Sequence, residues 1–197
     1  MTTCIRPLVG RRQVLAWGVA GLLAGPHASL QAQDTARVDP MPASIADALG
    51  TPRRAGSSLF RFWGLEVYEA SLWVTPDFRA SSYWLTTFAL GLNYRRSLDG
   101  GAIAKRSLEE MQRAGSLSPA QNSEWLAAMA RLFPNVKKDD TLTGLHLPHR
   151  GARFLINGRP LGEVADADFS RRFFGIWLDT ATSAPDLRTA LLAGTSP

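Results

Sequence analysis

Residues 60–74 have the sequence FRFWGLEVYEASLWV, and residues 169–192 have the sequence FSRRFFGIWLDTATSAPDLRTALL. Both segments are rich in aromatic side chains, although they lie far apart in the chain. The end of the first segment alternates, and the apolar positions that share one face are Tyr68, Ala70, Leu72 and Val74. Because strict alternation indicates a β-strand with one buried face, residues 59–74 are predicted to be strand-like.

Three further segments have strand patterns. Residues 83–95 alternate again, and residues 141–147 and 153–156 are predicted to be short strands. Asn157-Gly158 follows the last of these between apolar flanks, and both residue types tolerate a positive φ. The sequence therefore predicts a two-residue β-hairpin turn at this point.

Helical patterns occupy the middle and the end of the chain. Capping residues and apolar spacing predict helices over residues 102–114, 119–132, from Asp166 or Asp168 to 178, and 185–192. In the second of these helices, Trp125, Met129 and Leu132 share one face, which is predicted to be buried. The order of strands, helices, strands and helices is typical of an α+β fold in which helices cover one face of a mostly antiparallel sheet.

The first 32 residues have the features of a secretory signal. Arg6, Arg11 and Arg12 precede an apolar run over residues 14–24, and no acidic residue occurs in this segment. The small residues at its end predict cleavage after Ala32. An export signal of this kind predicts a periplasmic protein.

Three questions about this segment stay open from the sequence. Cleavage after Ala28 is a second choice, and an uncleaved N-terminal anchor is an alternative to cleavage. The paired arginines also resemble a twin-arginine signal, so the export route is either that one or the general one. With the signal at residues 1–32, residues 33–50 are expected to form an N-terminal arm and residues 51–197 a single domain.

Bulk properties argue against several classes of function. Three of the 22 basic residues precede residue 33, so 19 remain against 17 acidic residues, a net charge of about +2 that does not suggest a nucleic-acid partner. Cys4 is the only cysteine, so a mature chain would have no disulfide and no thiol nucleophile. His146 and His149 are the only two histidines after the signal, fewer than a zinc site needs. No cofactor is predicted, because no glycine-rich loop joins a strand to a helix.

Arginines beside aromatic residues are the best candidates for a binding site. Arg61 lies between two phenylalanines, and Arg95 and Arg96 follow Tyr94. A guanidinium in such surroundings suits a carboxylate or phenolate, and the hydroxyl of Tyr68 or Tyr94 would add a hydrogen bond. The alternative is that these arginines only extend over aromatic side chains at the rim of the sheet.

Together with three shorter motifs, the two aromatic segments resemble the bacterial chalcone-isomerase-like family. These motifs are TFALGLNY at residues 87–94, LFPNV at 132–136 and FLINGRPLG at 154–162. The resemblance implies an open-faced β-sandwich, in which a large antiparallel sheet is backed by a layer of helices with a ligand cleft between them. It narrows the fold more than the activity, because this family has both catalytic and non-catalytic members.

Residue by residue, the resemblance argues against chalcone cyclisation. Trp63 stands where the plant enzymes have a catalytic threonine, and the catalytic tyrosine and asparagine are missing after the next strand. In the non-catalytic branch an arginine and a tyrosine bind the carboxylate of a fatty acid. The resemblance implies Arg61 for this arginine and Tyr94 for this tyrosine.

The resulting hypothesis is an exported, non-catalytic protein that binds a fatty acid or a similar small amphiphile at Arg61, Tyr68, Tyr94 and Arg95. One alternative is an isomerase of the intramolecular-lyase type that acts on a phenolic or enone substrate. Another is a structural partner without a small ligand. Arg171-Arg172 precedes two phenylalanines and allows a peripheral membrane contact as a further partner, although a solvated helix face is the favoured interpretation. The sequence does not indicate an oligomeric state.

Overall fold

The computed structural model describes residue 46 and residues 49–196. In chain order the elements are β1 (Arg53–Phe62), β2 (Leu65–Val74), the 3-10 helix η1 (Ala80–Leu85), β3 (Phe88–Tyr94), α2 (Gly100–Met111), the 3-10 helix η2 (Gln112–Ala114), α3 (Pro119–Leu132), β4 (Thr141–Leu147), β5 (Gly151–Ile156), β6 (Arg159–Val164), α4 (Ala167–Leu178) and α5 (Pro185–Leu192). The predicted signal over residues 1–32, with its cleavage site, and most of the predicted arm lie outside the described residues.

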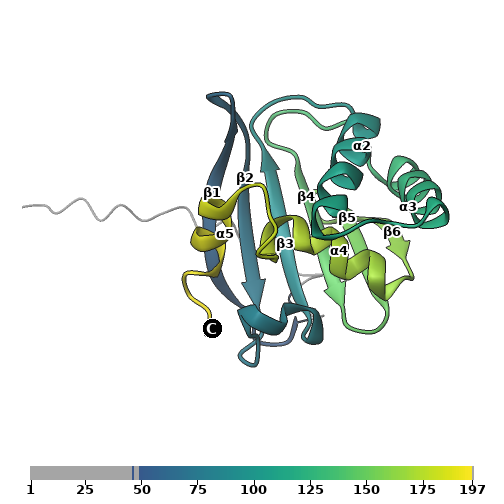
Figure 1. The fold of residues 1–197 in the computed structure, drawn as a ribbon. Helices are drawn as coiled ribbons and strands as arrows, with labels where there is room; N and C mark the ends of the chain where they lie inside the picture. Colours follow the sequence, from purple (N-terminus) through teal and green to yellow (C-terminus); the bar gives the residue numbers. More distant parts are fainter. Residues whose placement is uncertain (1–45, 47–48, 197) are drawn as a thin grey trace, which may run out of the picture. The chain divides into compact units, whose positions relative to one another are not determined.

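The strands form one antiparallel sheet in which each strand pairs with the next one along the chain, from β1 to β6 (Figure 1). Two helices, α2 and α3, lie in the connection between β3 and β4. Neighbouring antiparallel strands need only short connections, so the chain builds the sheet in sequence order. The α+β prediction with a mostly antiparallel sheet is confirmed.

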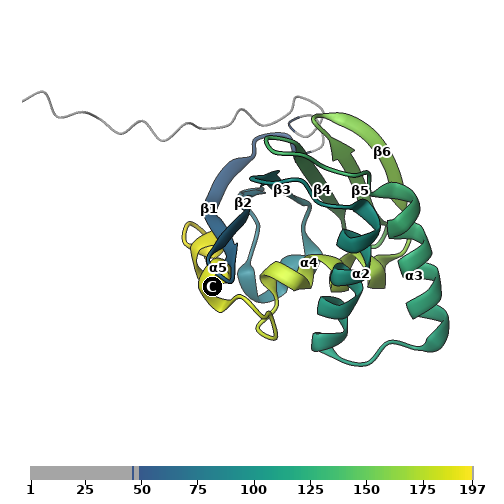
Figure 2. The ribbon, with the colours of Figure 1, turned by 90° about the horizontal axis from the view of Figure 1, so that it is seen from above.

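The helices cover one face of the curved sheet (Figure 2). Helix α5 packs on β1 and β2, and α4 packs on β4 and β5. Helix α2 packs against both α3 and α4. The open-faced arrangement that the sequence predicted is therefore present, with helices α2, α4 and α5 forming a layer on one side of the sheet.

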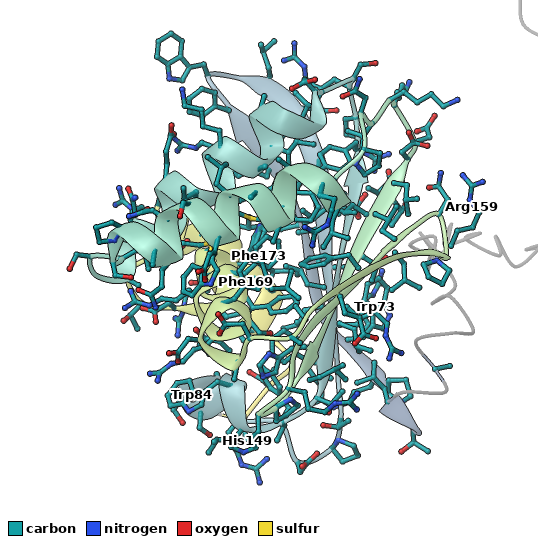
Figure 3. The ribbon with its side chains drawn as sticks, turned by 90° about the vertical axis from the view of Figure 1, so that its right-hand side faces the viewer. Trp73, Trp84, His149, Arg159, Phe169 and Phe173 are labelled. Atoms are coloured by element: carbon teal, nitrogen blue, oxygen red, sulfur yellow. The ribbon has the colours of Figure 1, made fainter. Side chains whose placement is uncertain are left out.

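Successive side chains along each strand point to opposite faces of the sheet, so the two faces have separate clusters of buried residues. The positions of β3 that face the helices are buried with the main core, namely Phe88, Leu90, Leu92 and Tyr94. Trp73 and Ala89 belong to a smaller cluster on the opposite face, with Leu49 packed on it. Figure 3 shows Phe169 and Phe173 on the helical side of the sheet and Trp73 on the other side.

Local signals position the helices as predicted. The Ser118 hydroxyl accepts a hydrogen bond from the Gln121 amide at 3.2 Å, and the Gln121 side chain accepts one from the Ser118 amide at 3.0 Å. This capping box starts α3, whose Trp125 and Met129 are buried as expected. Asp166 caps α4 by accepting a hydrogen bond from the Phe169 amide.

The Asn157-Gly158 hairpin is also confirmed, with φ of 49° and 77° at these two residues. Positive φ at both central positions is the geometry of a type I′ turn, which matches the twist of the flanking strands. The turn joins β5 to β6 and fixes their register at the edge of the sheet.

Two segments differ from the prediction. The segment expected as one strand over residues 59–74 is two strands, because the chain turns at Trp63-Gly64 with φ of 51° and 78°. The segment expected as a strand over residues 83–95 begins with η1, and β3 starts only at Phe88. No helix in the part of the chain that the structure describes has both the length and the hydrophobicity that a membrane crossing requires.

Candidate functional site

A cavity of about 450 Å³ lies between the helix-facing side of β1–β3 and the helices α2, α4 and α5. Pockets for small ligands typically have volumes of about 300–1,000 Å³ and apolar walls. The side chains around this cavity come from both layers and are Phe60, Phe62, Leu65, Val67, Tyr68, Leu92, Tyr94, Arg96, Leu98, Ala102, Ile103, Arg106, Ser107, Glu110, Phe133, Leu142, Phe173, Ile176, Trp177, Ser183, Ala184 and Leu187.

Aromatic rings build much of the wall. Phe60 and Tyr68 are stacked with centroids 5.0 Å apart, on neighbouring strands. From α4, Phe173 and Trp177 contact one another at 5.5 Å. Since these rings are held by the sheet on one side and by a helix on the other, the cavity is part of the fold rather than a gap between loops.

Two tyrosines place hydroxyl groups in this apolar site. The Tyr68 hydroxyl accepts a hydrogen bond from Trp177 Nε1 at 3.0 Å, and its ring lies edge-on to that of Tyr94 at 6.0 Å. Burial raises the pKa of Tyr68, and the nearby Glu110 carboxylate raises it further. Burial also raises the pKa of Tyr94. Both hydroxyls are therefore protonated at neutral pH and suit hydrogen-bond donation rather than proton abstraction.

The cavity also has three charged side chains, the cations Arg96 and Arg106 and the anion Glu110. Arg106 pairs with the Glu110 carboxylate one helical turn away and with the Glu109 carboxylate at 3.3 Å, and its side chain is 60% exposed. The Glu110 side chain is 8% exposed, and its Oε2 makes no hydrogen bond but lies 3.7 Å from Arg113 Nε. Two cations against one carboxylate leave a net positive charge, which favours an anionic group at the rim.

Of the four site residues that the sequence predicted, the structure brings only Tyr68 and Tyr94 together at this cavity. Arg61 lies outside it, with a side chain that is 55% exposed and a 2.8 Å ion pair with Glu66. Arg95 also lies outside it and pairs with Glu69 on the opposite face of the sheet. Both arginines point away for the same reason. Each directly follows a cavity-facing strand residue, and neighbouring side chains alternate between the two faces of a sheet.

Sequence reasoning missed the charged residues on α2. Ile103, Arg106, Ser107 and Glu110 all line the cavity. Their spacing of i, i+3, i+4 and i+7 puts them on one helix face, and this pattern was the available signal. The pattern did not indicate a cavity wall, because a helix face with an arginine and a glutamate is usually solvent-exposed.

Trp63 does not lie on a strand, so its position differs from that of the strand threonine with which the sequence aligned it. It lies in the turn between β1 and β2 and is 91% exposed. Its side chain therefore does not contribute to the cavity wall.

His146 and His149 lie in different surroundings, one buried and the other exposed. His146 is 2% exposed and stacks on Phe88 at 4.9 Å. Its Nε2 donates to the Trp84 carbonyl oxygen at 3.0 Å, so its Nδ1 accepts from the Ser170 hydroxyl at 2.7 Å. His149 is exposed, and within the described residues no three His, Cys, Asp or Glu side chains converge as a metal site requires.

His146 predicts a pH dependence of stability. Burial lowers the pKa of His146 in the folded protein, while the unfolded chain titrates near the ordinary value of 6.5. The unfolded state therefore binds more protons as pH falls below this value, and we expect folding stability to fall with it. The loss is at most about 1.4 kcal/mol per pH unit. Urea unfolding between neutral and mildly acidic pH measures it.

The control for this titration is the variant His146→Gln, which should remove the part of the pH slope that belongs to the buried ring. Equal slopes for the wild type and His146→Gln would show that His146 does not titrate on unfolding.

A second, more polar cleft of about 330 Å³ lies on the opposite face of the sheet. Its walls are Glu69, Ser71, Trp73, Gly91, Asn93, Asp139, Thr141, Thr143, Asn157 and Gly158. Asn93 Nδ2 already donates to Thr141 Oγ1 at 3.0 Å, and Trp73 lies over the bare Cα of Gly91. With two carboxylates and no cavity-facing cation among these residues, this cleft is less suited to an anionic ligand.

Comparison with solved structures supports the fold described above. A fatty-acid binding protein of Arabidopsis thaliana superposes with a TM-score of 0.56 over 72% of this chain and 86% of that chain. The sequences are 16% identical, so this likeness establishes the fold alone.

Sequence comparison identifies the family. A protein of Haemophilus influenzae described as uncharacterized is 30% identical over 106 residues, which are 54% of this chain and 52% of that protein. The chain thus spans about half the length of this curated relative. Residues 55–193 match the family described as chalcone isomerase-like, from β1 to the end of α5. The match covers most of the chain, and the protein belongs to the chalcone isomerase-like family.

Proposed function

We propose that this protein is a non-catalytic binding protein for a fatty acid or a similar small amphiphile. The observation that carries the proposal is the cavity of about 450 Å³ with aromatic walls and a net positive charge at its rim. Apolar walls suit an acyl chain, and a cationic rim suits its carboxylate. A protein with this fold is described as a fatty-acid binding protein, which agrees with this choice of ligand.

We assign the head group to Arg106, assisted by Tyr68. Arg106 lies at the rim on α2 and its side chain remains 60% exposed, so its guanidinium has N–H donors left after pairing with both Glu109 and Glu110. Tyr68 lies close enough for its pKa to respond to the charges of both Arg106 and Glu110. Its hydroxyl proton is free to donate, because the bond from Trp177 uses the hydroxyl as an acceptor.

This assignment predicts that Arg106→Ala weakens binding of a free fatty acid by about 1.5–3 kcal/mol, the range for hydrogen bonds to charged groups. That loss is about 10-fold to 100-fold in Kd. Arg106→Lys should restore only part of the affinity, because an ammonium lacks the planar fork of a guanidinium. Isothermal titration calorimetry measures each Kd.

Two controls separate the head group from general damage. Arg61→Ala removes an arginine that lies outside the cavity and should leave the Kd unchanged. The methyl ester has no negative charge, so Arg106→Ala should weaken binding of the acid much more than of the ester. If the acid and the ester bind the wild type equally well, Arg106 does not bind a carboxylate.

We also propose that the protein acts in the periplasm after removal of residues 1–32. The acid-free basic start and the apolar run of the N-terminal segment motivate this proposal. N-terminal sequencing of the exported protein should begin at Gln33 or within a few residues of it. A product that retains residues 14–24 would instead indicate an anchor.

A further inference from the structure

The turn between β1 and β2 exposes a continuous apolar surface. Phe62, Trp63 and Leu65 are 54%, 91% and 56% exposed, and the rings of Phe62 and Trp63 are stacked at 5.8 Å. Single exposed apolar residues are ordinary on a protein surface. Three exposed apolar residues within four consecutive positions, including an almost fully exposed indole, indicate a surface that binds a partner. We refer to residues 62–65 as the hairpin tip.

The backbone of the hairpin tip is not the one that a tryptophan prefers. Trp63 has φ of 51°, and Gly64 has φ of 78°. The turn at Asn157-Gly158 has nearly the same angles, 49° and 77°, with the residue type that tolerates them best. A bulky residue in the left-handed region is unfavourable. Trp63 is therefore not explained by the needs of the turn, which asparagine would meet better.

The hairpin tip borders the mouth of the cavity. Phe62 and Leu65 line the cavity and are both more than half exposed, so the cavity opens to solvent beside them. Arg96 and Arg106 lie around the same opening and are also exposed. Among the described residues, Arg96 has no partner in an ion pair. An apolar tip with arginines beside it therefore surrounds the entrance to an apolar cavity.

These features favour a lipid bilayer over a protein as the partner. Tryptophan is enriched at the boundary between head groups and acyl chains, and arginines attract anionic head groups. A stable protein interface usually takes about 800 Å² from each partner, spread over roughly 20–30 residues. The hairpin tip is much smaller than this, but shallow insertion into a membrane needs only a few apolar anchors.

We propose that the hairpin tip docks the protein on an anionic lipid bilayer, with the mouth of the cavity facing the membrane. This inference rests on the proposed function in one respect: docking in this orientation would let an amphiphile pass between the bilayer and the cavity. The site differs from the one that the sequence suggested. That earlier site was Arg171-Arg172. Arg171 lies over the Trp84 ring at 4.2 Å, and Trp84 is at the bottom of Figure 3. The β1–β2 turn is at the top of Figure 1, which has the same vertical axis, so the two sites lie at opposite ends of the domain.

Co-sedimentation with vesicles tests the docking. The mature wild type should sediment with vesicles of phosphatidylglycerol and phosphatidylcholine. Trp63→Asn should reduce the partition coefficient by about tenfold or more, because binding scales with the apolar area that is inserted. The variant should fold at least as well, since asparagine suits the turn. Arg96→Gln should reduce binding to the mixed vesicles, but not the weaker binding to phosphatidylcholine alone.

The matched control is Leu85→Asn, which removes a side chain of similar exposure, 53%, from another part of the surface. Its vesicle binding should equal that of the wild type. Equal losses in Leu85→Asn and Trp63→Asn would overturn the assignment to the hairpin tip. So would a wild type that does not sediment with the mixed vesicles, or one that forms a dimer through Trp63 instead.

A titration without vesicles separates this inference from the proposed function. Trp63 lies outside the cavity wall, so Trp63→Asn should bind a short, water-soluble fatty acid with the Kd of the wild type. A wild type that binds vesicles but no fatty acid would refute the proposed function and leave the docking intact. A Trp63→Asn variant that loses the soluble acid as well would show that the hairpin tip belongs to the ligand site, and would overturn the docking proposal.

Discussion

Replacing Trp125 with alanine is expected to lower the free energy of unfolding by about 3–5 kcal/mol. Trp125 is 2% exposed and contacts Phe169 with ring centroids 5.7 Å apart. Its Nε1 donates to Asp166 Oδ2 at 2.9 Å, while Oδ1 of the same carboxylate caps α4. The indole therefore joins α3 to the start of α4, and alanine would leave both a void and an unpaired carboxylate oxygen.

Urea unfolding of the wild type, Trp125→Ala and Trp125→Phe divides this loss into its parts. Trp125→Phe retains most of the packing and removes the donor to the Asp166 carboxylate, so its loss should be about 1.5–3 kcal/mol, the range for a hydrogen bond to a charged group. A loss below about 1 kcal/mol for Trp125→Ala would contradict the packing of α3 described above.

Filling the cavity is expected to weaken binding of the amphiphile strongly without unfolding the protein. Ser107 is buried on α2 and lines the cavity, so Ser107→Trp places an indole in the space of the acyl chain. Excluding four methylene groups costs about 3 kcal/mol at about 0.8 kcal/mol each, which weakens binding roughly 100-fold. Calorimetry measures the Kd.

Ser107→Trp should lower the affinity without lowering the stability of the protein. An unfilled apolar cavity lowers stability in proportion to its volume, so Ser107→Trp should have a melting temperature equal to or above that of the wild type. Ser123→Trp, at an exposed position of α3, is the matched control and should retain full affinity. If Ser107→Trp binds as tightly as the wild type, the ligand does not occupy this cavity.

The parts of the fold that the sequence predicted depend on local chemistry. Ser118 and Asp166 start their helices because their side chains bond to amides three residues ahead. Asn157 and Gly158 form a turn because few other residues adopt a positive φ at both positions. Each of these signals lies within a few residues of the structure that it determines, so the chain alone is sufficient to find it.

The turn at Trp63 escaped prediction because its residue type indicates the opposite structure. Aromatic residues favour strands, and only Gly64 indicated a break. The candidate site escaped in part because it combines a strand face and a helix face that meet only in the folded chain. Phe60 and Phe62 both face the cavity, so Arg61 between them points away, and the cation at the rim comes instead from Arg106 on α2.

A crystal structure with a brominated fatty acid would show where the ligand binds, because the anomalous signal of bromine locates the acyl chain without assumptions. We predict that the bromine lies in the cavity between β1–β3 and the helices α2, α4 and α5, with the carboxylate within hydrogen-bond distance of Arg106 or Tyr68. A bromine in the polar cleft beside Trp73 and Asn93, or none at a saturating ligand concentration, would contradict the account.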